Sequence, residues 1–217
     1  MKFTIEKRIL TEAVGNLQRA VSAKTSIPAL EGILIRSGEE KLILSAYDLE
    51  IGMQTELPAV ISESGAIILT AKLFSEIVRK SPADDITIET DDRNTATITS
   101  GVSCFTIIGM NAAEFPEFPK VTDTDTLRLP AGVLKSMIRQ TLFAVADSNA
   151  KPIHQGSLFK IENRTLDVVS VDGYRLALRR EAIPFDGSLE FVVPGKTPGE
   201  GLKPLRDDEG EKKKRPE

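Results

Sequence analysis

The sequence predicts an α+β protein built from a duplicated unit, with helices on one face of antiparallel sheets. The first observation behind this prediction is an internal repeat, in which the stretch from Pro152 to Leu176 matches an upstream stretch without a gap. The second is that apolar alternation, typical of strands, gives way twice to helical spacing within the first half of the chain. Equivalent positions are 124 apart and include Pro28 and Pro152, Gly32 and Gly156, Leu34 and Leu158, Leu42 and Leu166, and Asp48 and Asp172.

The amino-terminal segment predicts a strand followed by a helix. Phe3 and Ile5 alternate with polar residues over positions 2–7, which indicates a strand with one buried face. The following residues switch to helical spacing, and Pro28 is expected to end that helix. The apolar positions of the helix are Leu10, Val14, Leu17 and Val21.

The rest of the first unit predicts three strands, and then a second strand, helix and three strands. The first three form a meander, because only short polar turns separate them. The second helix uses apolar positions between 73 and 78 and is stopped at Ser81 and Pro82. The predicted strands are 32–36, 42–46, 51–57, 66–69, 86–90, 95–99 and 103–108.

Two prolines, Pro116 and Pro119, and a polar stretch separate the first unit from the second. We expect a first domain over residues 1–120, a linker over 121–126, a second domain over 127–197 and a disordered tail over 198–217. In the second domain we expect a strand at 127–129, a helix at 131–144, and strands near 158, at 166–171 and at 175–179. The offset maps the second helix of the first unit onto a glycine- and proline-rich stretch after Thr197, so the second domain is predicted to be incomplete.

Composition excludes several classes of protein. No apolar run is long enough to cross a bilayer, so we expect no membrane partner and a cytoplasmic location. A single cysteine, Cys104, excludes an internal disulfide, and with one histidine it cannot build a common structural zinc site. We therefore expect no metal and no cofactor.

The net charge of −4 argues against a nucleic-acid partner until its distribution is considered. The three predicted helices carry seven basic and two acidic residues, a local charge of +5 that leaves −9 for the remainder. Lys72 and Arg79 are seven apart, and Lys135 and Arg139 are four apart, so each pair shares a helix face. Such faces suit sequence-independent phosphate contacts, although an ordinary solvated helix face has the same pattern.

Catalysis has little support. His154 is the sole histidine, and no serine or cysteine lies in a recognisable nucleophile motif. Asp48 and Asp172 could form a carboxylate pair, but as equivalent positions of a repeat they are better explained as turn residues before a strand. Gly195-Lys196-Thr197 fails as a phosphate-binding loop because Glu190 stands where its first glycine is required.

Four motifs in the right order, on a duplicated unit, resemble the bacterial DNA polymerase III β subunit, the sliding clamp. The resemblance extends from Met1 to about Thr197. It implies a ring of six such domains in two subunits, with helices lining the hole and antiparallel sheets outside. The motifs are Phe115–Pro119 (FPEFP), Ser45–Met53 (SAYDLEIGM), Val171–Leu178 (VDGYRLAL) and Phe191–Thr197 (FVVPGKT).

The resemblance also implies site residues. A partner cleft receives linear peptides of the polymerase and the clamp loader, and His154 departs from the apolar residue usual there. A first-domain edge containing Phe105 and Ile107 meets another subunit of a homodimer. The implied cleft residues are His154, Val171, Gly173, Tyr174, Arg175 and Leu176. The implied contacts to double-stranded DNA are Lys24, Lys72, Arg79, Lys135, Arg139 and Lys151.

Length is the main departure from the family, which has three domains. We expect a truncated clamp subunit, with an atypical tail, that does not close the usual ring. The leading hypothesis is a DNA-replication processivity factor, which is not an enzyme. The alternative is a non-DNA peptide-binding module that retains part of the cleft. A third hypothesis, a small enzyme using Asp48 or Asp172, requires activity that disappears when either aspartate is replaced.

Overall fold

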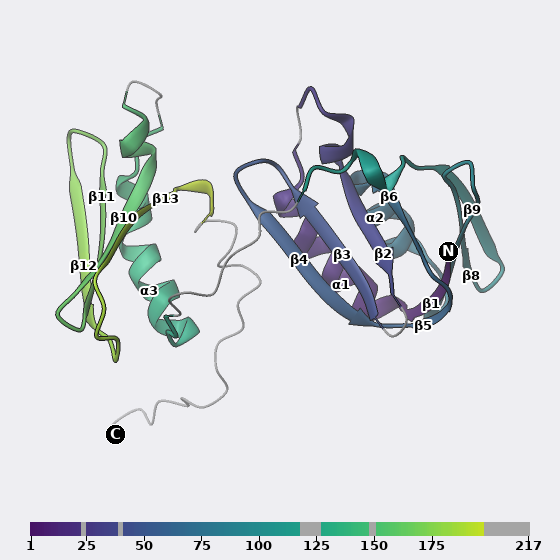
Figure 1. The fold of residues 1–217 in the computed structure, drawn as a ribbon, viewed down its shortest axis with the longest axis horizontal. Helices are drawn as coiled ribbons and strands as arrows, with labels where there is room; N and C mark the ends of the chain where they lie inside the picture. The colour runs from purple at the N-terminus through teal and green to yellow at the C-terminus, as the bar shows by residue number, and fades with distance from the viewer. Residues whose placement is uncertain (23–24, 39–40, 118–126, 148–150, 198–217) are drawn as a thin grey trace. The chain divides into compact units, whose positions relative to one another are not determined.

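The computed structural model describes residues 1–22, 25–38, 41–117, 127–147 and 151–197. They belong to two compact units, Met1–Lys120 and Val121–Glu217 (Figure 1). Both units combine antiparallel sheets with helices, which confirms the predicted fold class.

The first unit contains two sheets and two α-helices. One sheet has the strand order β5-β1-β7-β8-β9 and the other has the order β4-β3-β2-β6. Every strand pair is antiparallel, and β2, β3 and β4 form the predicted meander. The elements are β1 Lys2–Glu6, α1 Lys7–Leu17, β2 Gly32–Ser37, β3 Lys41–Tyr47, β4 Gly52–Pro58, β5 Val60–Glu63, β6 Gly65–Thr70, α2 Ala71–Lys80, β7 Asp85–Thr90, β8 Thr95–Ser100 and β9 Ser103–Ile108.

A single apolar core joins the two helices to both sheets of the first unit. In α2, Phe74, Ile77 and Val78 are buried, while Lys72 and Arg79 are exposed. The helical spacing of apolar residues therefore predicted the buried face correctly, and the basic pair lies on the solvent side.

Two predictions for the first unit are wrong. The first helix ends at Leu17 and continues only as the short 3-10 helix η1 Gln18–Ala20, whereas Pro28 begins the 3-10 helix η2 Pro28–Glu31. A proline suits the first turn of a helix because its missing N–H would have no partner there. Strand β5 was not predicted, since it has only four residues and gives too short a pattern of alternation.

The second unit repeats the first at the predicted offset. Helix α3 Ala131–Thr141 and strands β11, β12 and β13 begin and end 124 positions after α1, β3, β4 and β6. The strand register also repeats, because Leu158 pairs with Val169 and Val192 as Leu34 pairs with Ser45 and Ile68. The strands are β10 Gly156–Glu162, β11 Thr165–Val171, β12 Leu176–Ala182 and β13 Leu189–Pro194, in the order β12-β11-β10-β13; η4 Leu142–Ala144 and η5 Pro152–Gln155 are 3-10 helices.

The predicted strand at 127–129 is wrong, although its burial pattern is right. Leu127 and Leu129 pack against the core of the second unit, but residues 127–130 have no strand geometry. The equivalent strand of the first unit, β1, pairs with β5 and β7. No described residue of the second unit supplies either partner strand, since 184–187 form no strand and 209–214 lie outside the described part of the chain.

Predictions for the tail lie mostly outside the described residues. Lys196 and Thr197 are helical, and the predictions for 198–217, like the linker at 121–126, fall on residues that are not described. Within the described ranges, no helix is long and apolar enough to cross a membrane.

Candidate functional site

The first candidate surface is the basic face of α2. Lys72 and Arg79 are exposed, and neither forms an ion pair with another described residue. The next lysine, Lys80, lies 3.9 Å from the carboxylate of Glu76 and is partly compensated. Two cations without an ion-pair partner among the described residues thus share one solvent-facing side of this helix.

The other helix of the first unit has less free positive charge. Lys7 of α1 donates a hydrogen bond from Nζ to the carbonyl of Ser81 at 2.6 Å, and Arg8 pairs with Glu6 at 2.9 Å. Both cations are therefore already engaged, which makes α2 the more available basic face of this unit.

The second unit presents a basic group whose members differ in exposure. Arg139, in the last turn of α3, is exposed, whereas Lys135 is half-buried, so the two do not lie equally open to solvent. Lys151 is exposed just before η5. Lys24, the remaining predicted DNA contact, lies outside the described residues.

The second candidate surface is the turn between β11 and β12. Asp172 Oδ1 accepts hydrogen bonds from the backbone N–H groups of Tyr174 and Arg175, both at 3.0 Å. Arg175 Nε donates to Asp172 Oδ2 at 2.8 Å. Gly173 adopts φ +95°, a conformation that favours glycine. The side chain of Tyr174 is fully exposed, and Leu176 is 65% exposed.

This turn, with its neighbours, brings the predicted cleft residues to one end of the sheet. Val171 pairs with Leu176 across β11 and β12. His154, in η5, precedes the start of β10, the strand that pairs with β11. His154 is half-buried, and its backbone N–H donates to the carbonyl of Lys151 at 2.9 Å.

Phe143 is a site residue that sequence reasoning missed. The guanidinium carbon of Arg175 lies 5.6 Å from the centre of its ring, within the range of a cation–π contact. Phe143 is exposed, but it lies within the apolar run Leu142–Val145, which gives no sequence signal that separates it from core residues.

The equivalent turn of the first unit has the same backbone hydrogen bonds but different flanking residues. Asp48 Oδ1 accepts from the N–H groups of Glu50 and Ile51 at 3.0 and 2.7 Å, so the turn itself is repeated. The equivalents of His154 and Arg175 are Leu30 and Ile51, which are both buried. The predicted role of the two aspartates as turn residues is confirmed. The tip of the turn is exposed in both units, at Leu49 and Glu50 in the first, so the units differ in the two flanking positions.

The hydrogen bonds from Tyr174 and Arg175 lower the pKa of Asp172 below its usual value. Such a carboxylate favours the ordered turn above its unfolded pKa of about 3.9, and this contribution is lost as the pH falls through the lower folded pKa. We expect the amide resonances of Tyr174 and Arg175 to titrate with a midpoint below that value in NMR spectra. Asp172→Asn is the control and removes the titration; a midpoint at or above the ordinary value would contradict the geometry.

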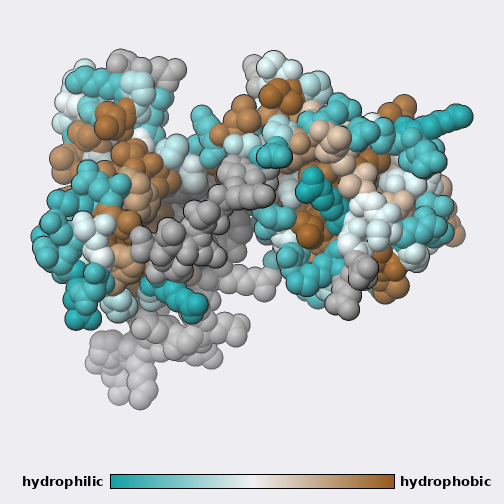
Figure 2. All heavy atoms as spheres, in the orientation of Figure 1, coloured by the Kyte–Doolittle hydropathy of each residue, from teal (hydrophilic) through white to brown (hydrophobic). Residues whose placement is uncertain are grey.

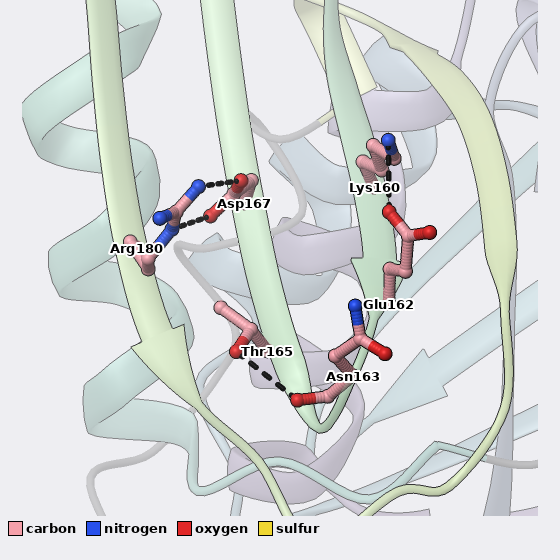
Figure 3. A pocket seen from close by; sticks show the side chains of 6 residues that line it. All are labelled: Lys160, Glu162, Asn163, Thr165, Asp167 and Arg180. Atoms are coloured by element: carbon pink, nitrogen blue, oxygen red, sulfur yellow. Dashed lines mark hydrogen bonds and ion pairs between the residues drawn. The ribbon is translucent and has the colours of Figure 1, made fainter.

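A polar hollow of about 310 Å³ on the sheet of the second unit offers no free charge to a ligand, because the charges that line it pair with one another (Figure 3). Arg180 donates to both carboxylate oxygens of Asp167 at 2.6 Å, which lowers the pKa of Asp167. Lys160 pairs with Glu162 at 3.0 Å. Among the described residues, no group of three or more His, Cys, Asp or Glu side chains could hold a metal ion.

The predicted subunit edge is β9, the outer strand of the five-stranded sheet. Phe105 is 36% exposed and available for contact. Ile107, by contrast, is only 9% exposed and packs in the core of the first unit, because it faces inward at that point of the strand. The more exposed apolar residue of this strand is Ile108.

Repeated antiparallel sheets backed by helices, with basic helix faces, define the sliding clamp class of fold. The chain belongs to the DNA polymerase III beta subunit family: residues 1–119 match its N-terminal domain and residues 128–213 its central domain. The second match extends past Thr197 into the segment that is not described. The prediction that the chain is not an enzyme agrees with its membership of this sliding clamp family.

Individual relatives agree with this assignment. The chain is 36% identical to the beta sliding clamp of Bacillus subtilis, over 96% of this chain and 58% of the relative. It is 31% identical to that of Staphylococcus aureus, with the same coverage. Solved sliding clamps of Bacillus subtilis and C. crescentus superpose with TM-scores of 0.94 and 0.86, at 35% and 30% identity, over 96% and 93% of this chain and 57% and 56% of theirs. The chain thus spans little more than half the length of the relatives it matches.

Proposed function

We propose that this chain acts in DNA replication as a processivity factor subunit that holds double-stranded DNA without regard to sequence. The observation that carries the proposal is the pair of uncompensated cations, Lys72 and Arg79, on the exposed side of α2. The proposed DNA contacts of the second unit are Lys135, Arg139 and Lys151. Lys24 of the first unit is also proposed to contact DNA.

Phosphate contacts suit this function because they carry no base identity. Lysine and arginine held on a rigid helix face attract the backbone through a long-range, salt-sensitive force. Contacts of this kind let a protein move along the duplex, which a processivity factor requires.

The exposed turn is proposed to bind linear peptides of the polymerase and the clamp loader. Gly173, Tyr174 and Arg175 form its tip, Val171 and Leu176 its base, and His154 its neighbour at the sheet end. Phe143 is added to this set because it lies against Arg175. The proposed working location is the cytoplasm, and β9 with Phe105 is the proposed edge for homodimer formation.

DNA association is tested by fluorescence anisotropy with a labelled duplex over a range of salt concentrations. We expect weak binding that falls steeply with salt and does not depend on base sequence. Binding that is unchanged by salt, or that requires one sequence, would contradict the proposal.

Ring closure is tested separately, by gel filtration with nicked circular DNA and with the same DNA linearised. We expect this chain of 217 residues to show no difference in retention between the two forms. Retention on the circle that is lost on linearisation would show a closed ring and would overturn that expectation.

A second function is favoured by the exposed turn itself: a peptide-binding module that does not use DNA. Tyr174 is fully exposed, and the chain carries a net charge of −4, which opposes DNA association. Peptide binding that persists while salt-dependent DNA association is absent would select this alternative.

A further inference from the structure

The guanidinium of Arg175 is held by two side chains from different parts of the second unit. Asp172 Oδ2 accepts a hydrogen bond from its Nε at 2.8 Å, and its central carbon lies 5.6 Å from the centre of the Phe143 ring. Asp172 belongs to the same turn as Arg175, whereas Phe143 belongs to the 3-10 helix η4. Two supports in separate elements restrict a long side chain more than either support does alone.

The carboxylate that holds Arg175 is itself fixed. Its other oxygen accepts hydrogen bonds from the backbone N–H groups of Tyr174 and Arg175, both at 3.0 Å, and the side chain of Asp172 is only 16% exposed. Among the described residues, no acceptor pairs with the terminal nitrogens of Arg175. The planar guanidinium therefore keeps one orientation and has donors left for another acceptor.

The repeat shows that the turn forms without this arrangement. The first-unit equivalents of Phe143 and Arg175, at the offset of 124, are Arg19 and Ile51. Helix η1, which carries Arg19, is the equivalent of η4, and Asp48 makes the same two backbone hydrogen bonds as Asp172. The cation and the apolar residue have thus exchanged places between the units. The turn itself requires neither Phe143 nor Arg175, so both are available for another role.

Phe143 also lies outside the apolar core of the second unit. Its neighbour Leu142 packs against that core, whereas Phe143 is not among the residues of the cluster. The described contact of the Phe143 ring is the one with Arg175. A substitution of Phe143 is therefore expected to act on the guanidinium rather than on the fold.

Apolar side chains flank Arg175 along the chain. Tyr174 precedes it and Leu176 follows it, and both are exposed. The space-filling view shows hydrophobic and hydrophilic side chains side by side on the surface of the second unit (Figure 2). A hydrogen bond that forms against apolar side chains is strengthened, because water is partly excluded from it.

We propose that Arg175, held in place by Asp172 and Phe143, donates paired hydrogen bonds to a carboxylate side chain of the bound peptide. The inference rests on the proposed peptide-binding function of this turn and adds the chemical class of the partner, an acidic residue between apolar ones. The planar fork of arginine matches a carboxylate better than it matches a single carbonyl oxygen. Phe143 is a positioning residue, since it acts through Arg175 and not on the peptide.

Two blocked tripeptides of nearly the same shape test the partner chemistry, acetyl-Leu-Glu-Leu-amide and acetyl-Leu-Gln-Leu-amide. Each is titrated into the ¹⁵N-labelled full chain and followed through the amide resonances of Tyr174 and Leu176. We expect the glutamate peptide to bind with a dissociation constant of about 1 mM and the glutamine peptide about tenfold more weakly. Arg175→Lys keeps the charge but removes the fork, and is expected to abolish most of this difference.

Variants of Phe143 test the positioning role. Phe143→Leu is expected to weaken the glutamate peptide about threefold and to leave the glutamine peptide unchanged, because the cation–π contact is lost. Phe143→Tyr keeps an aromatic ring and is expected to restore binding. In an Arg175→Ala background, Phe143→Leu is expected to have no further effect. In the free chain, Phe143→Leu is expected to broaden the Nε–H resonance of Arg175, and circular dichroism checks the fold.

The outcomes separate this inference from the function on which it rests. Equal binding of the two peptides would overturn the inference and leave peptide binding at this turn intact. An effect of Phe143→Leu that persists without Arg175 would overturn the positioning role. Binding of neither peptide, or resonance shifts confined to the first unit, would count against peptide binding at the turn and would overturn the inference with it.

Discussion

Phe74→Ala is expected to lower the free energy of unfolding of the first unit by about 3–5 kcal/mol. Phe74 is fully buried and lies in the core that joins α2 to both sheets. Removing its ring leaves a cavity between α2 and the sheets, which can collapse only if the helix shifts toward the sheets and disturbs its other contacts. Urea denaturation followed by circular dichroism measures the change, and we expect the transition of the second unit to stay in place.

Leu73→Ala is the matched control for this prediction. Leu73 is the adjacent residue of α2 and is 47% exposed, so its loss is expected to change the free energy of unfolding by only about 0.5 kcal/mol. If both variants were equally destabilised, the assignment of the buried face of α2 would be wrong. If the second unit lost stability to the same extent, the two units would not unfold independently.

Most of the fold follows from periodicity and from the repeat. The offset of 124 placed α3, β11, β12 and β13 correctly because equivalent residues have kept their apolar pattern. The predicted strand at Leu127 and Leu129 is wrong because apolar alternation indicates only which residues are buried. A strand also needs a neighbouring strand to accept and donate its backbone hydrogen bonds. Strand β5 was missed because its four residues show too little alternation to predict a strand, and its strand geometry comes from pairing with β1.

The site was predictable only in part. The turn at Asp172 follows from its aspartate and glycine, and its equivalence to the turn at Asp48 is visible in the sequence. What the sequence does not show is exposure: Arg175 is exposed while its equivalent Ile51 is buried. Exposure depends on which segments pack over the turn, and contacts such as that of Phe143 with Arg175 join residues far apart in the chain.

The same limit applies to Ile107 of β9 and to Leu158 of β10. Strand β9 was correctly predicted, and Phe105 and Ile107 share one of its faces, but alternation does not say how far along that face the core extends. The comparison of Leu34 with Leu158 needs the structure for the same reason, because their sequence environments are alike and only their covers differ. Equivalent residues that differ in burial are therefore the most informative places in a duplicated protein.

Reversing both cations of α2, Lys72→Glu with Arg79→Glu, is expected to weaken duplex DNA binding about tenfold or more at ~0.1 M salt. Both residues are exposed, and neither is neutralised by a described acidic neighbour, so each is free to contact a phosphate. Losing two phosphate contacts also lowers the slope of log affinity against log salt by about 1.8, at about 0.9 for each contact. Anisotropy titrations at several salt concentrations measure both quantities.

The control for charge reverses two cations on a sheet of the same unit, Arg36→Glu with Lys41→Glu; unlike the α2 cations, Lys41 is paired with Glu56 at 2.6 Å. These residues are exposed on β2 and β3, and their reversal changes the net charge by the same amount. If DNA binding depended only on net charge, both double variants would weaken it equally, and the helix face would have no special role. We expect the sheet variant to lose far less affinity for DNA and to keep the slope of log affinity against log salt. Phosphate contacts are short-range, so they depend on which face of the protein carries the cations. The electrostatic field of more distant charges is screened within about 10 Å at that salt concentration.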